Sequence, residues 1–216
     1  MTSVGDLTSM FFITRVKTCR IDTKSYAFGR IAHIIFCQIK IVLYICGKSG
    51  KTTLYKLIDN FCLFWLKYVE PHKSDTDFMT ENMTSNIMKS WRGVAFEELC
   101  WQHIGQIKQA LGIAGVGSTI SAWGVKGTDE TDGAQIDLVI VRNDNVVNLC
   151  EMKFVGSEYV IDKEEEAKLR NRIETLKHTL SPKQTVHLTM VTTYGVAYGK
   201  HSGVVQKQVT LDDLFL

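Results

Sequence analysis

The chain has 216 residues, of which 45% are hydrophobic and only two are proline, and its net charge is +2. This composition is ordinary for a globular protein and excludes a disordered or low-complexity chain. No secretory signal is recognisable, and the most apolar run, residues 31–46, is too short and too polar to cross a bilayer. We therefore expect a cytoplasmic protein that does not enter a membrane.

Charge is distributed unevenly along the chain. Residues 1–53 contain eight Lys or Arg residues against Asp6 and Asp22, a net charge of +6, so the remaining residues carry −4. A basic segment before a mildly acidic domain is compatible with nucleic acid or an acidic partner. A solvated basic surface is the simpler interpretation.

The six cysteines show no CxxC pair and no regular spacing; they stand at positions 19, 37, 46, 62, 100 and 150. Cys62, Cys100 and Cys150 lie among apolar residues. We interpret them as small core residues in a reducing compartment, and expect neither disulfides nor a zinc site.

In the first third of the chain, the β-branched run 39–46 predicts a strand. Apolar residues at helical spacing predict a helix over 54–69, which Pro71 ends. The polar residues 71–86 predict a loop. We place the division between an N-terminal basic segment, 1–75, and a second domain, 76–216, in this loop.

The second domain reads as helix, strand, strand, strand, helix, strand. The predicted elements are a helix over 91–111, strands over 118–125, 134–141 and 146–154, a helix over 161–180, a strand over 185–193 and a last strand within 204–210. The Asn143-Asp144-Asn145 run is typical of a hairpin turn. This order predicts an α/β fold.

Three charged residues interrupt the apolar strands of the predicted hairpin. Asp137 lies in AQIDLVIV, and Glu151 and Lys153 lie in NLCEMKF. Charges in such strands are costly unless they are paired or bind a metal. Alternation places Glu151 and Lys153 on one face, and the hairpin brings Asp137 near Glu151. Two converging carboxylates suit Mg²⁺ or Mn²⁺, and Lys153 would orient the attacking water and stabilise negative charge.

The segment GAQIDLVIVRNDNVVNLCEMKF resembles the core of the PD-(D/E)xK, or restriction-endonuclease-like, nuclease superfamily, and RGVAFEELC resembles the helix before that core. The resemblance implies a restriction-endonuclease-like core, in which helices flank a mixed sheet, and a divalent-metal-dependent nuclease that cleaves DNA phosphodiester bonds. It implies Asp137, Glu151 and Glu97 as metal ligands and Lys153 as a further catalytic residue. Glu97 matches the position better than Glu98.

A narrower resemblance links residues 54–216 to the C-terminal part of bacterial and archaeal AAA+-type ATPases that end in a nuclease-like domain. The stretches LYKLIDNFCLFWLKYVE, WRGVAFEELCWQHIGQIKQALGI and VHLTMVTTYGV carry it. It implies a tail domain with an ATPase partner, and residues 1–75 as a winged-helix or linker remnant of the ATPase. Many nucleases of this fold work as pairs, so a homodimer is a further expectation.

Two other functions remain open at this point. The domain could be a catalytically inactive DNA-binding or docking module of an AAA+ ATPase system. The run IKIVLYICGKSGKTTL also suggests an ATP-binding P-loop over Gly47–Thr52, but Ile45 stands where the motif requires its first glycine. We expect no nucleotide binding.

Several residues have ordinary structural interpretations. His103 and His187 are expected in the core, and Gln135 is expected to face solvent, although it could assist the site. The helix over 161–180 carries basic residues that could contact phosphates, but its five acidic residues favour a solvated face. The basic residues are Lys163, Lys168, Arg170, Arg172 and Lys177.

Overall fold

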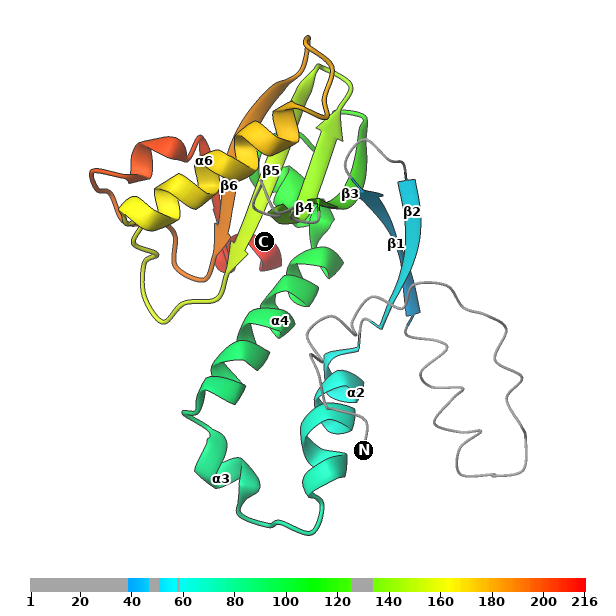
Figure 1. Cartoon of the computed structure of the whole chain (residues 1–216), viewed down its shortest axis with the longest axis vertical. Coiled ribbons are helices and arrows are strands. Elements are labelled where there is room, and N and C mark those ends of the chain that lie inside the picture. Colours follow the sequence, from blue (N-terminus) through cyan, green and yellow to red (C-terminus); the bar gives the residue numbers. More distant parts are fainter. Residues whose placement is uncertain (1–38, 47–50, 58, 126–133) are drawn as a thin grey trace, which may run out of the picture. The chain divides into compact units, whose positions relative to one another are not determined.

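The computed structural model describes residues 39–46, 51–57, 59–125 and 134–216 (Figure 1). The chain divides into two compact units, which we call the N-terminal unit and the C-terminal unit. They are Met1–Leu43 with Thr52–Ser85, and Tyr44–Lys51 with Asn86–Leu216. The predicted division at 75/76 stays a prediction. Expectations for residues 1–38, for Gly47–Gly50 and for the turn at 127–133 lie outside the described residues.

Short elements make up the described residues before Asn86. They are β1 (Ile39–Cys46), β2 (Lys51–Leu57), α2 (Asn60–Phe64), η3 (Trp65–Val69), η4 (Glu70–His72) and α3 (Phe78–Asn82). The predicted strand over 39–46 is confirmed, whereas the predicted helix over 54–69 is wrong in its first part. The helix starts late because Asp59 caps it: the Asp59 side chain accepts a hydrogen bond of 2.9 Å from the Cys62 backbone N–H. The predicted loop over 71–86 is also wrong, since it contains α3.

A five-stranded mixed sheet forms the centre of the C-terminal unit. Its strands are β3 (Ser118–Val125), β4 (Ala134–Arg142), β5 (Val146–Lys153), β6 (Thr185–Thr192) and β7 (Lys207–Thr210). They are ordered β3-β4-β5-β6-β7, antiparallel from β3 to β5 and parallel from β5 to β7. Residues 44–46, at the end of β1, add a parallel pairing on the β3 side. The predicted α/β fold with a mixed sheet is confirmed.

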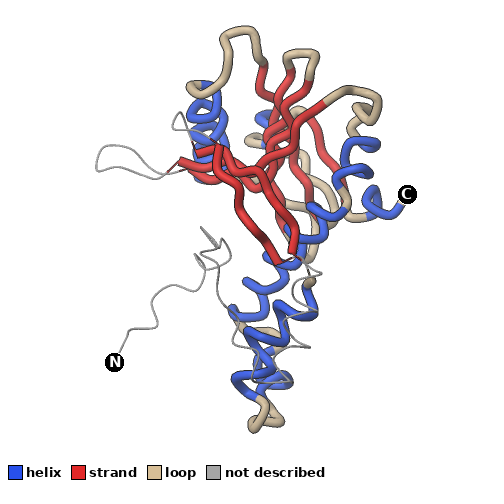
Figure 2. Tube along the Cα trace, turned by 90° about the vertical axis from the view of Figure 1, so that its right-hand side faces the viewer, coloured by secondary structure: helices blue, strands red, loops and turns tan. Residues whose placement is uncertain are grey.

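Helices lie on both sides of this sheet (Figure 2). They are α4 (Asn86–Gln102), α5 (Ile104–Ala110), α6 (Lys163–Lys177), η5 (Ser202–Val204) and η6 (Asp212–Phe215). The prediction of a single helix over 91–111 is wrong at both its start and its middle. The helix is interrupted at His103, whose φ of −109° and ψ of 29° leave the helical region. Its ring Nδ1 lies 2.9 Å from the Leu99 carbonyl oxygen, an acceptor that the backbone also uses.

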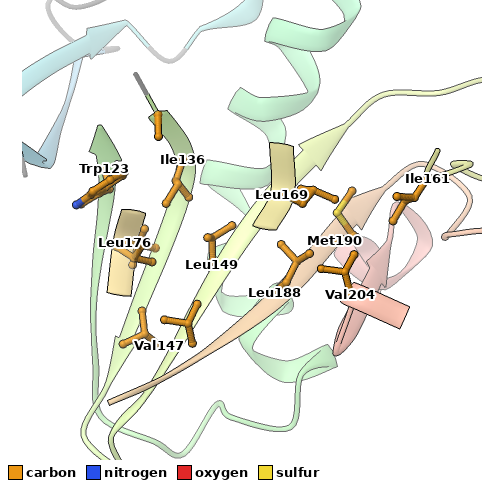
Figure 3. Close-up of a cluster of buried hydrophobic side chains, with 13 residues drawn as sticks. Trp123, Ile136, Val147, Leu149, Ile161, Leu169, Leu176, Leu188, Met190 and Val204 are labelled. Atoms are coloured by element: carbon orange, nitrogen blue, oxygen red, sulfur yellow. The ribbon is translucent and has the colours of Figure 1, made fainter. Parts of the chain in front are cut away.

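Helix α6 makes the crossover between the parallel strands β5 and β6 and packs on β4 and β6. Its Leu169 and Leu176 point toward Leu149 and Leu188 of the sheet (Figure 3). All four side chains are almost completely buried. A core of this kind fixes α6 against the sheet, and with it every side chain on the inner face of the helix.

The cysteines of the described side chains are free. Cys100 and Cys150 are fully buried, as expected for core residues, whereas Cys62 is half-buried and does not belong to the core. Burial raises the pKa of the Cys150 thiol to about 12, which makes it inert. In the described part of the chain, no helix combines the length and the apolar character that a membrane crossing needs.

Candidate active site

A β-bulge in β4 positions Asp137. The register of β3 against β4 shifts between Ser121 and Trp123, so that Asp137 and Leu138 both oppose the single residue Ala122. A bulge bends the strand locally and turns a side chain out of the regular alternation. Asp137 therefore lies where β4 changes the face that its side chains present.

On its other side, β4 pairs with β5 in a regular antiparallel ladder. The ladder ends at the pair Leu138–Cys150, and Asp137 and Glu151 are the next residues of their strands beyond it. One Asp137 carboxylate oxygen lies 3.4 Å from the Met152 backbone nitrogen, which donates to it. The hairpin thus brings together the two acids that the sequence placed on neighbouring strands.

Glu151 lies at the centre of a buried group of charges. Its side chain is 3% exposed, and its Oε1 lies 2.9 Å from Lys153 Nζ and 2.9 Å from Arg172 Nη1. A buried carboxylate is tolerated when cations of this kind offset the loss of hydration. Glu151 is therefore shared between a strand lysine and a helix arginine.

Asp137 is electrostatically strained by its neighbours. Burial, followed by the nearby charges of Glu151 and Glu97, raises the pKa of its carboxyl to about 8, although the Met152 backbone hydrogen bond and Lys153 act to lower it. Three acidic side chains from α4, β4 and β5 thus act on one another.

Lys153 is held between two carboxylates. Its ammonium lies 2.9 Å from Glu151 Oε1 and 3.8 Å from Glu165 Oε1 of α6. Burial alone would lower the pKa of Lys153, but these carboxylates outweigh it and raise the pKa. Tyr159 adds to this group, since burial and a hydrogen bond with Glu165 raise the pKa of its hydroxyl. Lys153 is therefore a fixed cation, suited to stabilise negative charge and unsuited to act as a base.

The donor set fits a hard divalent cation in part. Glu151 Oε2 is buried and makes no hydrogen bond within the described residues, and Asp137 offers carboxylate oxygens beside it. Oxygen donors of this type suit Mg²⁺ or Mn²⁺. Among the described residues, however, no three His, Cys, Asp or Glu side chains are gathered closely enough to hold a metal ion. Glu97 acts on Asp137 through its charge, and its role as a ligand stays a prediction.

Arg172 and Glu165 are site residues that the sequence interpretation missed. Both lie on the inner face of α6, because Glu165, Leu169, Arg172 and Leu176 follow one another at spacings of four, three and four. The signal was present: a charged residue within the apolar stripe of an amphipathic helix. The expectation of a uniformly solvated face for the basic residues of this helix is wrong for Arg172, whose side chain is 24% exposed.

The remaining predicted residues lie elsewhere or have ordinary surroundings. Gln135 is exposed, as expected, whereas His103 and His187 are half-buried and do not belong to the core. The P-loop interpretation loses its structural context, because a strand begins at Lys51 where that motif requires a helix. Threonines 52 and 53, which are β-branched, favour the strand.

No protein-family model and no curated protein matches the chain. Among solved structures, it is similar to the crystal structure of the protein of unknown function AF1548, with 17% sequence identity and a TM-score of 0.36. The similarity covers 54% of this chain and 64% of that one, so the chain spans somewhat less than two thirds of that protein. A similarity at this level carries no argument about function.

Proposed function

We propose that this chain is a divalent-metal-dependent nuclease acting on DNA, and that its C-terminal unit is a restriction-endonuclease-like core. The order α4, β3, β4, β5, α6, β6 supports the proposal, because it is the order expected from the sequence resemblance to the PD-(D/E)xK superfamily. The observation that carries the proposal is the approach of Asp137 to β5 beyond the last pair of the ladder, where one of its oxygens lies 3.4 Å from the Met152 nitrogen and Lys153 Nζ lies 2.9 Å from Glu151.

Each residue has a distinct part in the proposed reaction. Asp137 and Glu151 would hold Mg²⁺ or Mn²⁺, with Glu97 as an accessory ligand. A bound divalent cation supplies Lewis-acid stabilisation of the phosphate and lowers the pKa of water. Lys153 stabilises the charge that develops on the phosphate oxygens and orients the attacking water, because its ammonium is fixed by Glu151 and Glu165. The Asp137 carboxyl would be deprotonated as a ligand of that cation.

Metal binding and plasmid cleavage, measured on the same samples, test the proposal. Wild type is expected to bind Mn²⁺ in calorimetry and to nick supercoiled DNA, and Asp137→Asn is expected to do neither. Glu164→Gln is the matched control, because Glu164 is an exposed acid in the first turn of α6. If wild type binds no Mn²⁺ at millimolar concentration and leaves the plasmid intact, the nuclease proposal is refuted.

A second function, a catalytically inactive DNA-binding or docking module of an AAA+ ATPase system, has one observation in its favour. Lys153 and Arg172 already compensate the charge of Glu151, as in a structural ion-pair network. Under this alternative, DNA binding depends on salt but cleavage does not occur at any metal concentration. The same two measurements separate the alternatives.

A further inference from the structure

Arg172 is a second counter-ion of Glu151, which already has one in Lys153. Lys153 already lies 2.9 Å from Glu151 Oε1, and Arg172 Nη1 meets the same oxygen atom at 2.9 Å. One carboxylate thus faces two cations through one oxygen, while its Oε2 makes no hydrogen bond to any described residue. Lys153 is also shared with Glu165, whereas Arg172 forms its ion pair with Glu151 alone among the described residues.

The guanidinium of Arg172 also has donors to spare. Arg172 Nη1 is buried and makes no well-aligned hydrogen bond within the described residues, so its contact with Glu151 is an ion pair only. A guanidinium carries five N–H donors in a planar fork, which matches the oxygens of a phosphate group. The side chain is 24% exposed, so solvent and a ligand can reach it. Its neighbour Leu169 is fully buried and fixes the helix that carries it.

We propose that Arg172 is a catalytic residue that binds a phosphate group of the DNA strand next to the cleaved bond. This inference rests on the proposed nuclease function, because it uses the same site. The Glu151 carboxylate holds the guanidinium in place before substrate arrives, and the phosphate then takes up the N–H donors that Glu151 leaves unused. Charge-assisted bidentate contacts of this type are among the strongest that proteins make with phosphate.

The chain offers a matched control on the same helix. Arg170 is two residues away, has a side chain that is 61% exposed and pairs with Glu166 at 2.6 Å. Positions two apart do not share a helix face, so Arg170 points away from Glu151. Arg170→Gln removes one positive charge from α6 without touching the proposed site.

Two measurements on the full chain test the role of Arg172. The first is the dissociation constant of a labelled DNA duplex in EDTA as a function of salt concentration. Arg172→Gln is expected to weaken binding about tenfold and to reduce the slope of log K against log salt by about one, as for the loss of one phosphate contact. Arg172→Lys should keep the slope, because it keeps the charge, and Arg170→Gln should leave both quantities unchanged.

The second measurement is Mn²⁺ affinity in calorimetry. Arg172→Gln is expected to bind Mn²⁺ several-fold more tightly than wild type, because a cation beside Glu151 is gone. An arginine that only holds Glu151 in place predicts an unchanged salt slope, and that result overturns the inference whichever way the Mn²⁺ affinity changes. No DNA binding by wild type overturns it as well. If the slope falls but wild type neither binds Mn²⁺ nor cleaves DNA, the phosphate contact stands and the nuclease function fails.

Discussion

Replacing Asp137 with asparagine should stabilise the fold in a pH-dependent way in the absence of metal. The folded chain raises the pKa of this carboxyl from 3.8 to about 8. The folded state therefore binds the proton more tightly than the unfolded state. The stability that this preference contributes is fully present below about pH 4, is lost as pH rises toward 8 and is constant above that. Asparagine has no proton to lose and can still accept the Met152 N–H bond.

The size of this effect follows from the linkage relation. Wild type loses at most about 1.4 kcal/mol of unfolding free energy per pH unit between pH 4 and pH 8, several kcal/mol in total. The advantage of Asp137→Asn over wild type should grow accordingly. Urea unfolding in EDTA at pH 5, 6, 7, 8 and 9 measures it.

The same hairpin provides the control. A hydrogen bond from Arg142 lowers the pKa of the exposed Asp144. The stability that this group contributes is present above its unfolded pKa and is lost only in acid. Asp144→Asn should therefore differ from wild type by an amount that does not change between pH 5 and pH 9. An advantage of Asp137→Asn that is constant over this range, or that shrinks with rising pH, would refute the reasoning about Asp137.

Three further predictions concern the site and its support. Glu151→Gln should destabilise the chain by about 3–5 kcal/mol in urea unfolding, because Lys153 and Arg172 lose their shared carboxylate; the control Glu164→Gln should change little, and an equal loss in both variants would contradict the assignment. Mn²⁺ binding should release about one proton per ion at pH 7 and far less at pH 9, because the Asp137 carboxyl is protonated only at the lower pH; calorimetry in buffers of different ionisation enthalpy measures this, and no release at pH 7 would contradict it. Leu169→Ala should cost about 2–5 kcal/mol, since Leu169 is fully buried between α6 and the sheet; a loss below 1 kcal/mol would show that α6 is not fixed as described.

The sequence was most informative where hydrophobic periodicity was strong. The three strands from Ser118 to Lys153 and the strand from Thr185 have the predicted bounds to within one residue. Asn145 stabilises the turn between β4 and β5, because its φ of 66° lies in the left-handed region that asparagine tolerates. These elements are set by local preferences, namely alternation, β-branched residues and turn chemistry, and a single sequence carries all three.

The sequence was least informative where one local contact decides between two structures. Asp59 moves the start of a helix by capping it, and the His103 ring interrupts another. Neither contact can be read from periodicity. The prediction of a solvated face for the basic residues of α6 failed for a different reason. It rested on the balance of acidic and basic residues over the whole helix, whereas Arg172 meets Glu151 because it lies within the apolar stripe.

The bulge at Asp137 explains how an acid can stand in the middle of an apolar strand. Ile136 and Val139 both belong to the core beneath α6, although strict alternation would place them on opposite faces. Because the register shift falls between them, the side chain of Asp137 does not have to follow the regular alternation between the two apolar faces of the sheet. It can then approach Glu151 on one side and the charge of Glu97 on the other, at the cost of a raised pKa. A carboxyl is costlier at this position than an apolar residue, and the proposed cation would lower that cost by supplying the counter-charge.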